Sequence, residues 1–402
     1  MGMNDTPQAN RIHIGFFGRR NAGKSSVVNA VTNQELSVVS EVMGTTTDPV
    51  TKSMELLPIG PVLIIDTPGF DDEGTLGELR VKRTKQVLNK TDIAVLVVDA
   101  TAGLSTPDYE IIEIFKEKNI DYILVYNKCD LLEVRDMRRL SAEENAILVS
   151  AKDKKNIDQL KEKIAFVVDS NKKDETSLVS DLVTGEKTVM LVVPIDKAAP
   201  KGRLILPQQQ VIRDLLDNDI ASVVVKENQV SEMLDKLNVK PSLVITDSHV
   251  FKKVAEQVPN DIMLTSFSIL MARYKGFLEE AVKGAFALDN LKSGDKILIS
   301  EGCTHHRQCG DIGTVKLPNW INDFTKKELI YEFTSGMSFP DELSEYSVII
   351  HCGGCMLNER EMKYRMKCAV DQNVPFTNYG TVIAYTNGIL HRSLEVFREK
   401  YR

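Results

Sequence analysis

Residues 18–25 read GRRNAGKS, which is the spacing of a phosphate-binding loop. Glycines in such a loop let backbone N–H groups surround phosphate oxygens, and the N-terminus of the following helix adds positive potential. Lys24 would reach the β- and γ-phosphates of a nucleotide, and the Ser25 hydroxyl would hold Mg²⁺. An apolar run precedes the loop and a helical pattern follows it, which is the context that this chemistry requires.

Three later motifs indicate which nucleotide is bound, and each follows an apolar run. DTPG at residues 66–69 offers a carboxylate to Mg²⁺ and a glycine N–H to the γ-phosphate. NKCD at residues 127–130 offers Asp130 to two N–H donors of guanine, which adenine lacks, and SAK at residues 150–152 would support the base. The four motifs in this order predict a guanine-nucleotide site with an intact hydrolytic apparatus.

A second group of reactive residues lies in the last quarter of the chain. Cys303-Thr-His305 follows the run KILIS, and HCGGC at residues 351–355 follows the run YSVII. Open α/β sheets place ligands at the carboxyl ends of strands, so Cys303, Cys352 and Cys355 would converge if these strands are neighbours. The two glycines allow close approach of backbone and leave N–H groups free to bond to sulfur. A CxxC pair alone could be a redox pair, but with CxH and HC it favours a metal site.

The spacing leaves the identity of the metal open. An iron–sulfur cluster suits three thiolates around a glycine-rich turn, whereas tetrahedral zinc suits three cysteines with His305 or His351. Cys309 is a spare thiol in a polar loop, and Cys368 falls on a helical run where a small buried residue is expected.

Alternating strand and helix patterns place these motifs in an α/β fold. Strands are predicted at residues 12–17, 62–65, 93–98, 122–126 and 146–149, at residues 188–193, 222–225, 242–245 and 262–265, and at residues 296–300 and 346–350. Helices of the later part are predicted at residues 209–216, 230–237, 250–258 and 269–290. The pattern predicts that residues 1–170 form the P-loop domain, a mostly parallel sheet with helices on both faces. Two smaller α/β domains follow it. These are residues 188–266 and 267–402, after a polar linker at residues 171–187.

Composition limits the range of partners. The 402 residues carry 57 acidic and 50 basic side chains, a net charge of −7, whereas nucleic-acid binders usually have a basic surplus. No run approaches the ~18 apolar residues of a membrane-spanning helix. The first residues contain no apolar signal core, so we expect a cytoplasmic protein that binds neither nucleic acid nor membrane.

GTTTD at residues 44–48 resembles switch I of the TrmE–Era branch of GTPases. The resemblance implies that Thr46, with Thr45 as the alternative, meets Mg²⁺ and the γ-phosphate. It also implies that Asn21 binds K⁺ and that Glu78, by loose spacing, orients the attacking water. Phe70 stands where many GTPases have a polar residue, so hydrolysis of GTP should be slow and stimulated by K⁺.

The motifs and this resemblance together define the expected site. The nucleotide-binding residues are Gly18, Asn21, Ala22, Gly23, Lys24, Ser25, Ser26, Thr45, Thr46, Asp66, Gly69, Asn127, Lys128, Asp130, Ser150, Ala151 and Lys152. The catalytic residues are Lys24, Thr46, Asp66, Gly69 and Glu78, with Ser25 and Thr46 on Mg²⁺ and Asn21 on K⁺.

The whole chain resembles the HydF family, maturation factors of [FeFe]-hydrogenase. The CxH and HCxxC groups on this scaffold carry the likeness, together with PIDKAAPKGRLILPQQQ at residues 194–210, which is similar to that family's dimerisation domain. The resemblance implies a 4Fe-4S cluster on Cys303, Cys352 and Cys355, with a labile fourth position for which His305 is a candidate.

The same resemblance implies a scaffold that receives a diiron precursor carrying CO and cyanide and delivers it to apo-hydrogenase. The radical-SAM maturases HydE and HydG would act upstream, GTP would gate partner association, and the middle domain would form a homodimer. The alternative is a TrmE-like GTPase of RNA modification with a structural zinc domain. The acidic balance and the absence of that family's C-terminal CxGK-type cysteine disfavour it.

Overall fold

The computed structural model describes residues 6–33, 50–67, 86–143, 145–170, 177–184, 188–195, 204–302, 311–336 and 338–397. The chain divides into two compact units, residues 1–174 and residues 175–402. In the described part of the chain, no helix is both long and apolar enough to cross a membrane. Several predicted site residues lie outside the described residues: Thr45, Thr46, Gly69, Phe70, Glu78, Cys303, His305 and Cys309.

The first unit is built on a six-stranded sheet in the order β2-β3-β1-β4-β5-β6. Only β2 runs antiparallel to its neighbour, and the other pairings are parallel. The strands are β1 (Ile12–Phe17), β2 (Val50–Leu56), β3 (Gly60–Asp66), β4 (Ile93–Asp99), β5 (Asp121–Asn127) and β6 (Ala146–Leu148). The five strands predicted in this unit are confirmed, because parallel strands covered on both faces are continuous apolar runs. The edge strand β2, VTKSMEL, is largely exposed and was not predicted.

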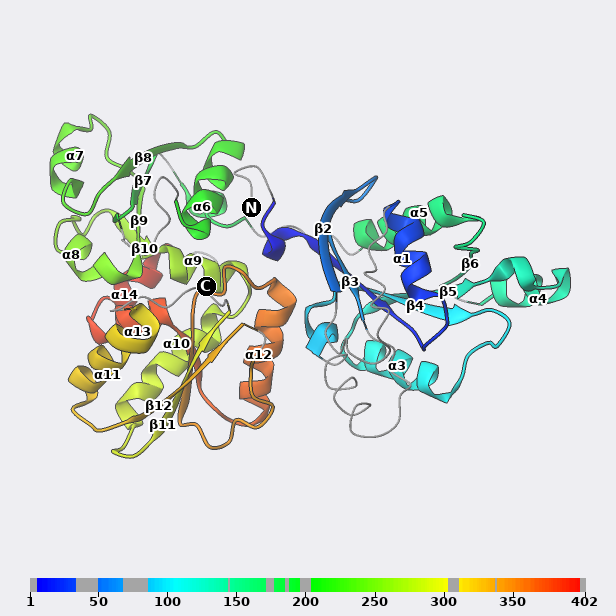
Figure 1. Cartoon of the computed structure of the whole chain (residues 1–402). Coiled ribbons are helices and arrows are strands. Elements are labelled where there is room, and N and C mark those ends of the chain that lie inside the picture. The colour runs from blue at the N-terminus through cyan, green and yellow to red at the C-terminus, as the bar shows by residue number, and fades with distance from the viewer. Residues whose placement is uncertain are drawn as a thin grey trace. The chain divides into compact units, whose positions relative to one another are not determined.

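Helices cover both faces of this sheet, as predicted (Figure 1). On one face α1 (Lys24–Thr32) and α5 (Ile157–Ser170) contribute buried residues such as Val27 and Leu160. On the other face α3 (Thr106–Glu117) buries Phe115. The structure also describes η1 (Gln8–Asn10), η2 (Cys129–Leu131), α4 (Val134–Ser141) and a helical segment at residues 86–90 in this unit.

The second unit contains two four-stranded sheets, ordered β10-β9-β7-β8 and β12-β11-β13-β14. Every pairing in both sheets is parallel. The first sheet comprises β7 (Thr188–Val192), β8 (Ala221–Val225), β9 (Leu243–Thr246) and β10 (Met263–Ser266). The second comprises β11 (Lys296–Glu301), β12 (Ile330–Ser335), β13 (Val348–His351) and β14 (Phe376–Asn378). The short strand β14 and the half-exposed β12 were not predicted.

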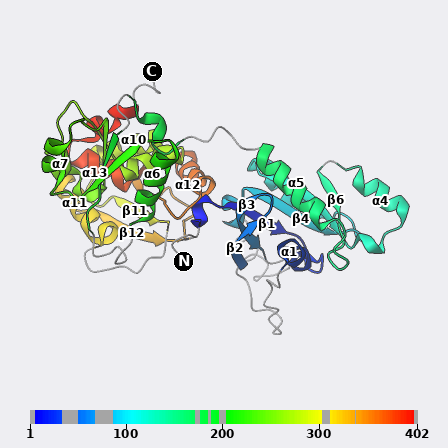
Figure 2. The ribbon, with the colours of Figure 1, turned by 90° about the horizontal axis from the view of Figure 1, so that it is seen from above.

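Both sheets of the second unit contribute to one hydrophobic core, which holds Leu191 and Ile245 of the first sheet with Leu298 and Ile349 of the second. Figures 1 and 2 show their elements packed into one body. Its helices are η3 (Ser180–Leu182), α6 (Leu206–Asp217), α7 (Val230–Lys236), η4 (Ser248–Val250), α8 (Phe251–Ala255), α9 (Phe267–Tyr274), α10 (Leu278–Phe286), η5 (Ala287–Asn290), η6 (Ile312–Lys316), α11 (Leu317–Thr325), α12 (Glu359–Asp371), α13 (Tyr379–Thr386), α14 (Leu390–Leu394) and η7 (Glu395–Phe397). The division into domains at residues 266 and 267 stays a prediction.

The structure corrects two details of the sequence analysis. The continuous helix predicted at residues 269–290 is wrong, because α9 ends before Lys275 and Gly276 adopts φ +72°, a left-handed conformation that interrupts a helix. Within the stretch expected to be a linker, Leu178 and Val179 are buried in the core of the second unit. The pair was not predicted to be buried, because it is short and polar residues surround it in the sequence.

Candidate functional site

Four of the predicted nucleotide motifs meet at one edge of the first sheet. The P-loop follows β1, Asp66 ends β3, Asn127 ends β5, and Ser150 follows β6. Asn127 joins three of these motifs: its Nδ2 donates to the Ala22 carbonyl at 3.1 Å, and its Oδ1 accepts from the Ala151 N–H at 3.1 Å. The side chain is buried, so these bonds hold the base motif against the phosphate loop.

Lys128 makes a second connection between the guanine motif and the P-loop. Its ammonium donates to the Asn21 carbonyl at 3.0 Å and to Asp99 Oδ2 at 2.6 Å. Burial alone would raise the pKa of Asp99, but hydrogen bonds from Lys128 and Thr101 outweigh it and lower that pKa. Asp99 is therefore a stable carboxylate partner that holds Lys128 in place.

Two positions of the P-loop require glycine, because neighbouring atoms leave no room for a Cβ atom there. A Cβ atom on Gly23, at φ +82°, would lie 2.2 Å from Nδ2 of Asn127. A Cβ atom on Gly18, at φ +152°, would lie 2.4 Å from the Val97 carbonyl oxygen. Asn21 also has a positive φ, +63°, and its side chain is exposed. The loop geometry thus depends on the residue types that the motif specifies.

The groups predicted to handle phosphate and Mg²⁺ are brought together at the start of α1. The Lys24 ammonium pairs with the Asp66 carboxylate, and Ser25 Oγ donates to Asp66 Oδ2 at 2.9 Å. One ammonium, one hydroxyl and one carboxylate at a helix N-terminus suit a magnesium–phosphate complex. The other predicted groups of this region, Thr45, Thr46, Gly69 and Glu78, lie outside the described residues.

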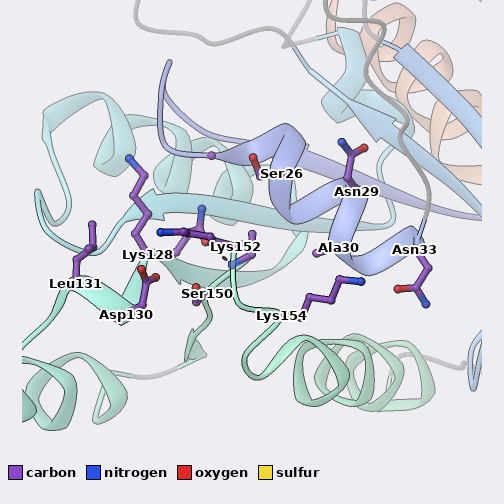
Figure 3. Close-up of a pocket in the computed structure, with 13 residues that line it drawn as sticks. Ser26, Asn29, Ala30, Asn33, Lys128, Asp130, Leu131, Ser150, Lys152 and Lys154 are labelled. Atoms are coloured by element: carbon purple, nitrogen blue, oxygen red, sulfur yellow. Dashed lines mark hydrogen bonds between the residues drawn. The ribbon is translucent and has the colours of Figure 1, made fainter.

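A cavity of about 720 Å³ opens beside this edge, within the range typical of ligand sites (Figure 3). Side chains from α1 lie on one side of the cavity, and the loops after β5 and β6, with Asp130 and Lys152, lie on the other. The lining residues are Gly23, Ser26, Asn29, Ala30, Asn33, Asn127, Lys128, Asp130, Leu131, Ser150, Ala151, Lys152 and Lys154. The motifs did not name Asn29, Ala30, Asn33, Leu131 or Lys154. Asn29, Ala30 and Asn33 could have been predicted from the sequence, because they lie at helical spacing from Ser26 and therefore share one face of the helix with it.

The two cysteine groups follow neighbouring strands. β11 and β13 pair in parallel, with Ser300 opposite His351. The two strands are therefore neighbours, as convergence of the cysteines requires. Gly302, which immediately precedes Cys303, donates its N–H to Cys352 Sγ at 3.1 Å, and Gly354 donates to the same sulfur at 3.4 Å. Amide hydrogen bonds of this kind orient and tune a sulfur ligand. Gly354 has φ +63°, so the second glycine of CGGC is required by its backbone conformation.

The two thiols of CGGC differ from a reactive redox pair. Burial raises the pKa of Cys352, and burial together with Cys352 raises the pKa of Cys355 to about 11. Redox cysteines of CxxC motifs instead have a lowered pKa. Neither residue forms a disulfide. Partly buried thiols of this kind become thiolates when a metal replaces the proton, so the donor set suits a metal or cluster.

His351 is engaged at both ring nitrogens. The fully buried Arg365 donates to Nε2 at 3.1 Å, so the proton lies on Nδ1, which donates to the Cys352 carbonyl at 2.9 Å. Burial and Arg365 lower the pKa of His351 to about 3, and the ring is neutral. The arrangement disfavours His351 as the fourth zinc ligand, because ligation at Nε2 would remove the acceptor of a buried guanidinium.

One group beside the cysteines, Lys275, was not predicted from the sequence. Lys275 follows α9, is only 3% exposed, and donates from Nζ to the carbonyls of Gly354 and Leu357. Burial lowers the pKa of this lysine to about 8, while the neighbouring Cys355 and Cys352 act to raise it. The sequence contains no signal for this contact, since 79 residues separate Lys275 from Gly354.

The described residues by themselves contain no group of three or more His, Cys, Asp or Glu side chains that could hold a metal ion. Cys303 and His305, two members of the predicted set, lie outside them. Cys368 lies on α12, half-buried against the core of the second unit, as expected for a packing residue.

The fold and nucleotide site of the first unit define a P-loop GTPase. The family model "50S ribosome-binding GTPase" matches residues 13–128. The model "Hydrogen maturase F dimerization domain" matches residues 178–276, and "Hydrogen maturase F tetramerization domain" matches residues 279–396. The last two together match more than half of the chain, which therefore belongs to the hydrogen maturase F (HydF) family.

Individual relatives share less of the chain. GTPase Der of Wolinella succinogenes is 35% identical over 185 residues, which cover 43% of this chain and 39% of that protein. The tRNA modification GTPase MnmE of Desulforamulus reducens is 31% identical over 158 residues, 38% of this chain and 34% of that protein. The chain thus spans less than two fifths of either relative's length. The solved structure of Era from Aquifex aeolicus aligns with 81% of this chain and 92% of that chain, at 16% identity and a TM-score of 0.34.

We expect Asp130→Asn to change base preference from guanine to xanthine. Loss of the carboxylate leaves a guanine N–H donor unpaired, which costs about 1–3 kcal/mol, or ~5- to 150-fold in affinity. Xanthine has a carbonyl in place of the guanine amino group and would accept from the new amide. Competition titrations with GTP, XTP and ATP measure the change, with the nearby exposed Glu133→Gln as the matched control. Equal, tight binding of ATP and GTP by the unmodified chain would contradict the assignment.

Proposed function

We propose that this chain is a GTP-dependent scaffold and carrier in the assembly of the [FeFe]-hydrogenase active site. It would hold a 4Fe-4S cluster on Cys303, Cys352 and Cys355, receive a diiron precursor, and deliver it to apo-hydrogenase in the cytoplasm. HydE and HydG would supply the precursor. Membership in the hydrogen maturase F family and the donor set of the second unit support this assignment.

One observation carries the proposal: Gly302, the residue before Cys303, is hydrogen-bonded to the sulfur of Cys352. Parallel pairing of β11 and β13 brings Cys352 and the end of the strand that precedes Cys303 in the sequence to one edge of the sheet, which supports the proposed ligand set. Gly302 and Gly354 then provide N–H donors to sulfur, as sulfur ligands of clusters commonly have.

Three thiolates favour an iron–sulfur cluster over zinc at this site. A tetrahedral zinc needs a fourth protein ligand, and His351 is already engaged by Arg365 and the Cys352 carbonyl, so His305 is the histidine of the two motifs that is left for zinc. Membership in the hydrogen maturase F family then favours the cluster. When bound, a cluster with one iron outside cysteine ligation supplies an exchangeable position at which a second iron unit can dock. His305 remains the candidate for that fourth position. The RNA-modification alternative is disfavoured, because both family models that match beyond the GTPase region are those of hydrogen maturase F.

The GTPase would act as a switch that controls partner association. Lys24, Ser25 and Asp66 would bind the phosphates and Mg²⁺, and Thr46, Gly69 and Glu78 would complete the catalytic group. With Phe70 in the place of a polar residue, we expect slow hydrolysis of GTP that depends on K⁺ bound by Asn21.

Single Cys→Ala substitutions test the carrier function. At Cys303, Cys352 or Cys355 the change should abolish the reconstituted cluster, seen as loss of bound iron and sulfide, of visible absorbance and of the EPR signal of the reduced protein. The same variants should fail to activate apo-[FeFe]-hydrogenase after incubation with HydE and HydG. Retained GTP hydrolysis would report on the first unit, and thermal unfolding followed by circular dichroism would show whether the second unit of the variants is folded.

Cys368→Ala is the matched control for these variants, because this cysteine packs on α12 against the core. Its cluster should match that of the unmodified chain. Cys309→Ala should also keep the cluster. If Cys309→Ala loses the cluster as completely as Cys303→Ala, the three-cysteine assignment is wrong, and with it the open iron position.

Hydrolysis of GTP should be faster in K⁺ than in Na⁺ at equal ionic strength. A cation held beside the β- and γ-phosphates stabilises charge that develops in the transition state. Asn21→Gly should remove the response, since glycine keeps the left-handed backbone but lacks the side-chain oxygen, whereas Asn21→Asp should preserve part of it. We expect about tenfold or more between the salts, or ~1.4 kcal/mol of barrier. Equal rates in both salts would exclude K⁺ activation.

The middle segment would form a homodimer through the edge of its sheet at β8, which pairs on its outer side with no described strand. β8 is the edge strand of β10-β9-β7-β8, and Val224 on it is 48% exposed. An exposed apolar edge strand favours pairing with another strand. Val224→Lys should shift the chain from dimer to monomer in light scattering after size exclusion. Val239→Lys, at a valine that is 46% exposed outside any strand, should stay dimeric. A dimer that survives Val224→Lys would place the interface elsewhere.

A further inference from the structure

Lys275 is a buried cation without a carboxylate partner among the described residues. Its side chain follows α9, lies in the interior at 3% exposure, and uses two N–H donors on the carbonyls of Gly354 and Leu357. Carbonyl dipoles alone compensate an ammonium poorly, and a buried charge normally requires an opposite charge nearby. Cys355, Cys352 and the carboxylate of Glu359 all act electrostatically on Lys275. Glu359 is more than half exposed and paired with Lys363, so solvent screens its charge, whereas the two sulfurs belong to the loop that Lys275 contacts and would provide the charge as metal-bound thiolates.

The backbone around Lys275 is arranged to place this charge. α9 ends at Tyr274, and the left-handed Gly276 turns the chain into α10, so Lys275 points away from the helix path into the CGGC loop. Both acceptors lie in or just after that loop: Gly354 between the two cysteines and Leu357 two residues past the second. A surface lysine would make no such contacts, since it would remain hydrated.

We infer that Lys275 is a positioning residue for the cluster site, whose ammonium fixes the CGGC loop and offsets the negative charge of the iron–sulfur cluster. The inference rests on the proposed 4Fe-4S function of Cys303, Cys352 and Cys355. A cluster held by three thiolates is anionic, and reduction adds a further negative charge. A cation buried beside it stabilises the reduced state more than the oxidised state, and therefore raises the reduction potential.

Neutral substitutions at Lys275 separate charge from packing. Lys275→Gln keeps an N–H donor for the loop carbonyls but removes the charge, and Lys275→Met keeps only the apolar stem. In the full-length chain with reconstituted cluster, both should have a more negative reduction potential than the unmodified protein, measured by EPR-monitored redox titration. Lys275→Arg, which retains the positive charge, should restore the potential at least in part.

Lys363→Met is the matched control. Lys363 lies near Gly276, where its Nζ would be 3.2 Å from an added Cβ atom, but its side chain is about half exposed and paired with Glu359. Solvent and the carboxylate screen its charge, so its removal should leave the potential unchanged. An equal shift for Lys363→Met and Lys275→Gln would overturn the inference, because the effect would then be general surface charge.

The outcomes distinguish this inference from the proposed function. If the unmodified chain takes up no cluster, the proposed function fails, and the role of Lys275 fails with it. If the cluster forms and Lys275→Gln has the same potential as the unmodified chain, only the role of Lys275 is refuted. Should Lys275→Met fail to fold, as judged by thermal unfolding followed by circular dichroism, the Lys275→Gln comparison decides the question.

Discussion

Strands that pair in parallel end at the same edge of a sheet, and this constraint produces both candidate sites. In the first unit it brings the loops after β1, β3, β5 and β6 to one edge, where Asn127 connects three of them by hydrogen bonds. In the second unit it aligns the ends of β11 and β13 and places the Gly302 amide on Cys352. Residues that are distant in sequence are therefore brought into contact by the pairing of strands.

Buried charge is the second determinant of the cysteine site. Arg365 is fully buried, donates to His351 and pairs with Glu361 at 2.8 Å, so the ring behind Cys352 has one tautomer and one orientation. Lys275 lies on the CGGC loop itself, where only carbonyl oxygens accept from it among the described residues. The two cations thus differ: Arg365 is paired with a buried carboxylate, whereas among the described residues no carboxylate accepts a hydrogen bond from Lys275.

The two units contribute differently to the identity of the protein. The P-loop and guanine motifs occur in many GTPases, and the chain shares them with relatives as different as Der and MnmE. The second unit combines two parallel sheets over a common core, and its residues match the hydrogen maturase F models. Recognition of the family therefore depends on the second unit, whereas the chemistry of GTP binding is read from the first.

The fold class, most strands and the nucleotide motifs could be predicted from the amino-acid sequence, because buried parallel strands are continuous apolar runs and phosphate loops require glycines at fixed positions. Exposed or short strands such as β2, β12 and β14 lack that signal. The break at Gly276 in the helix predicted at residues 269–290, and the burial of Lys275 and Arg365, became evident only from the packed fold. Apolar periodicity continues through the break, and a lysine or arginine is expected at the surface unless a distant segment supplies its partner. Which segment supplies that partner depends on tertiary packing, and local sequence patterns contain no information about it.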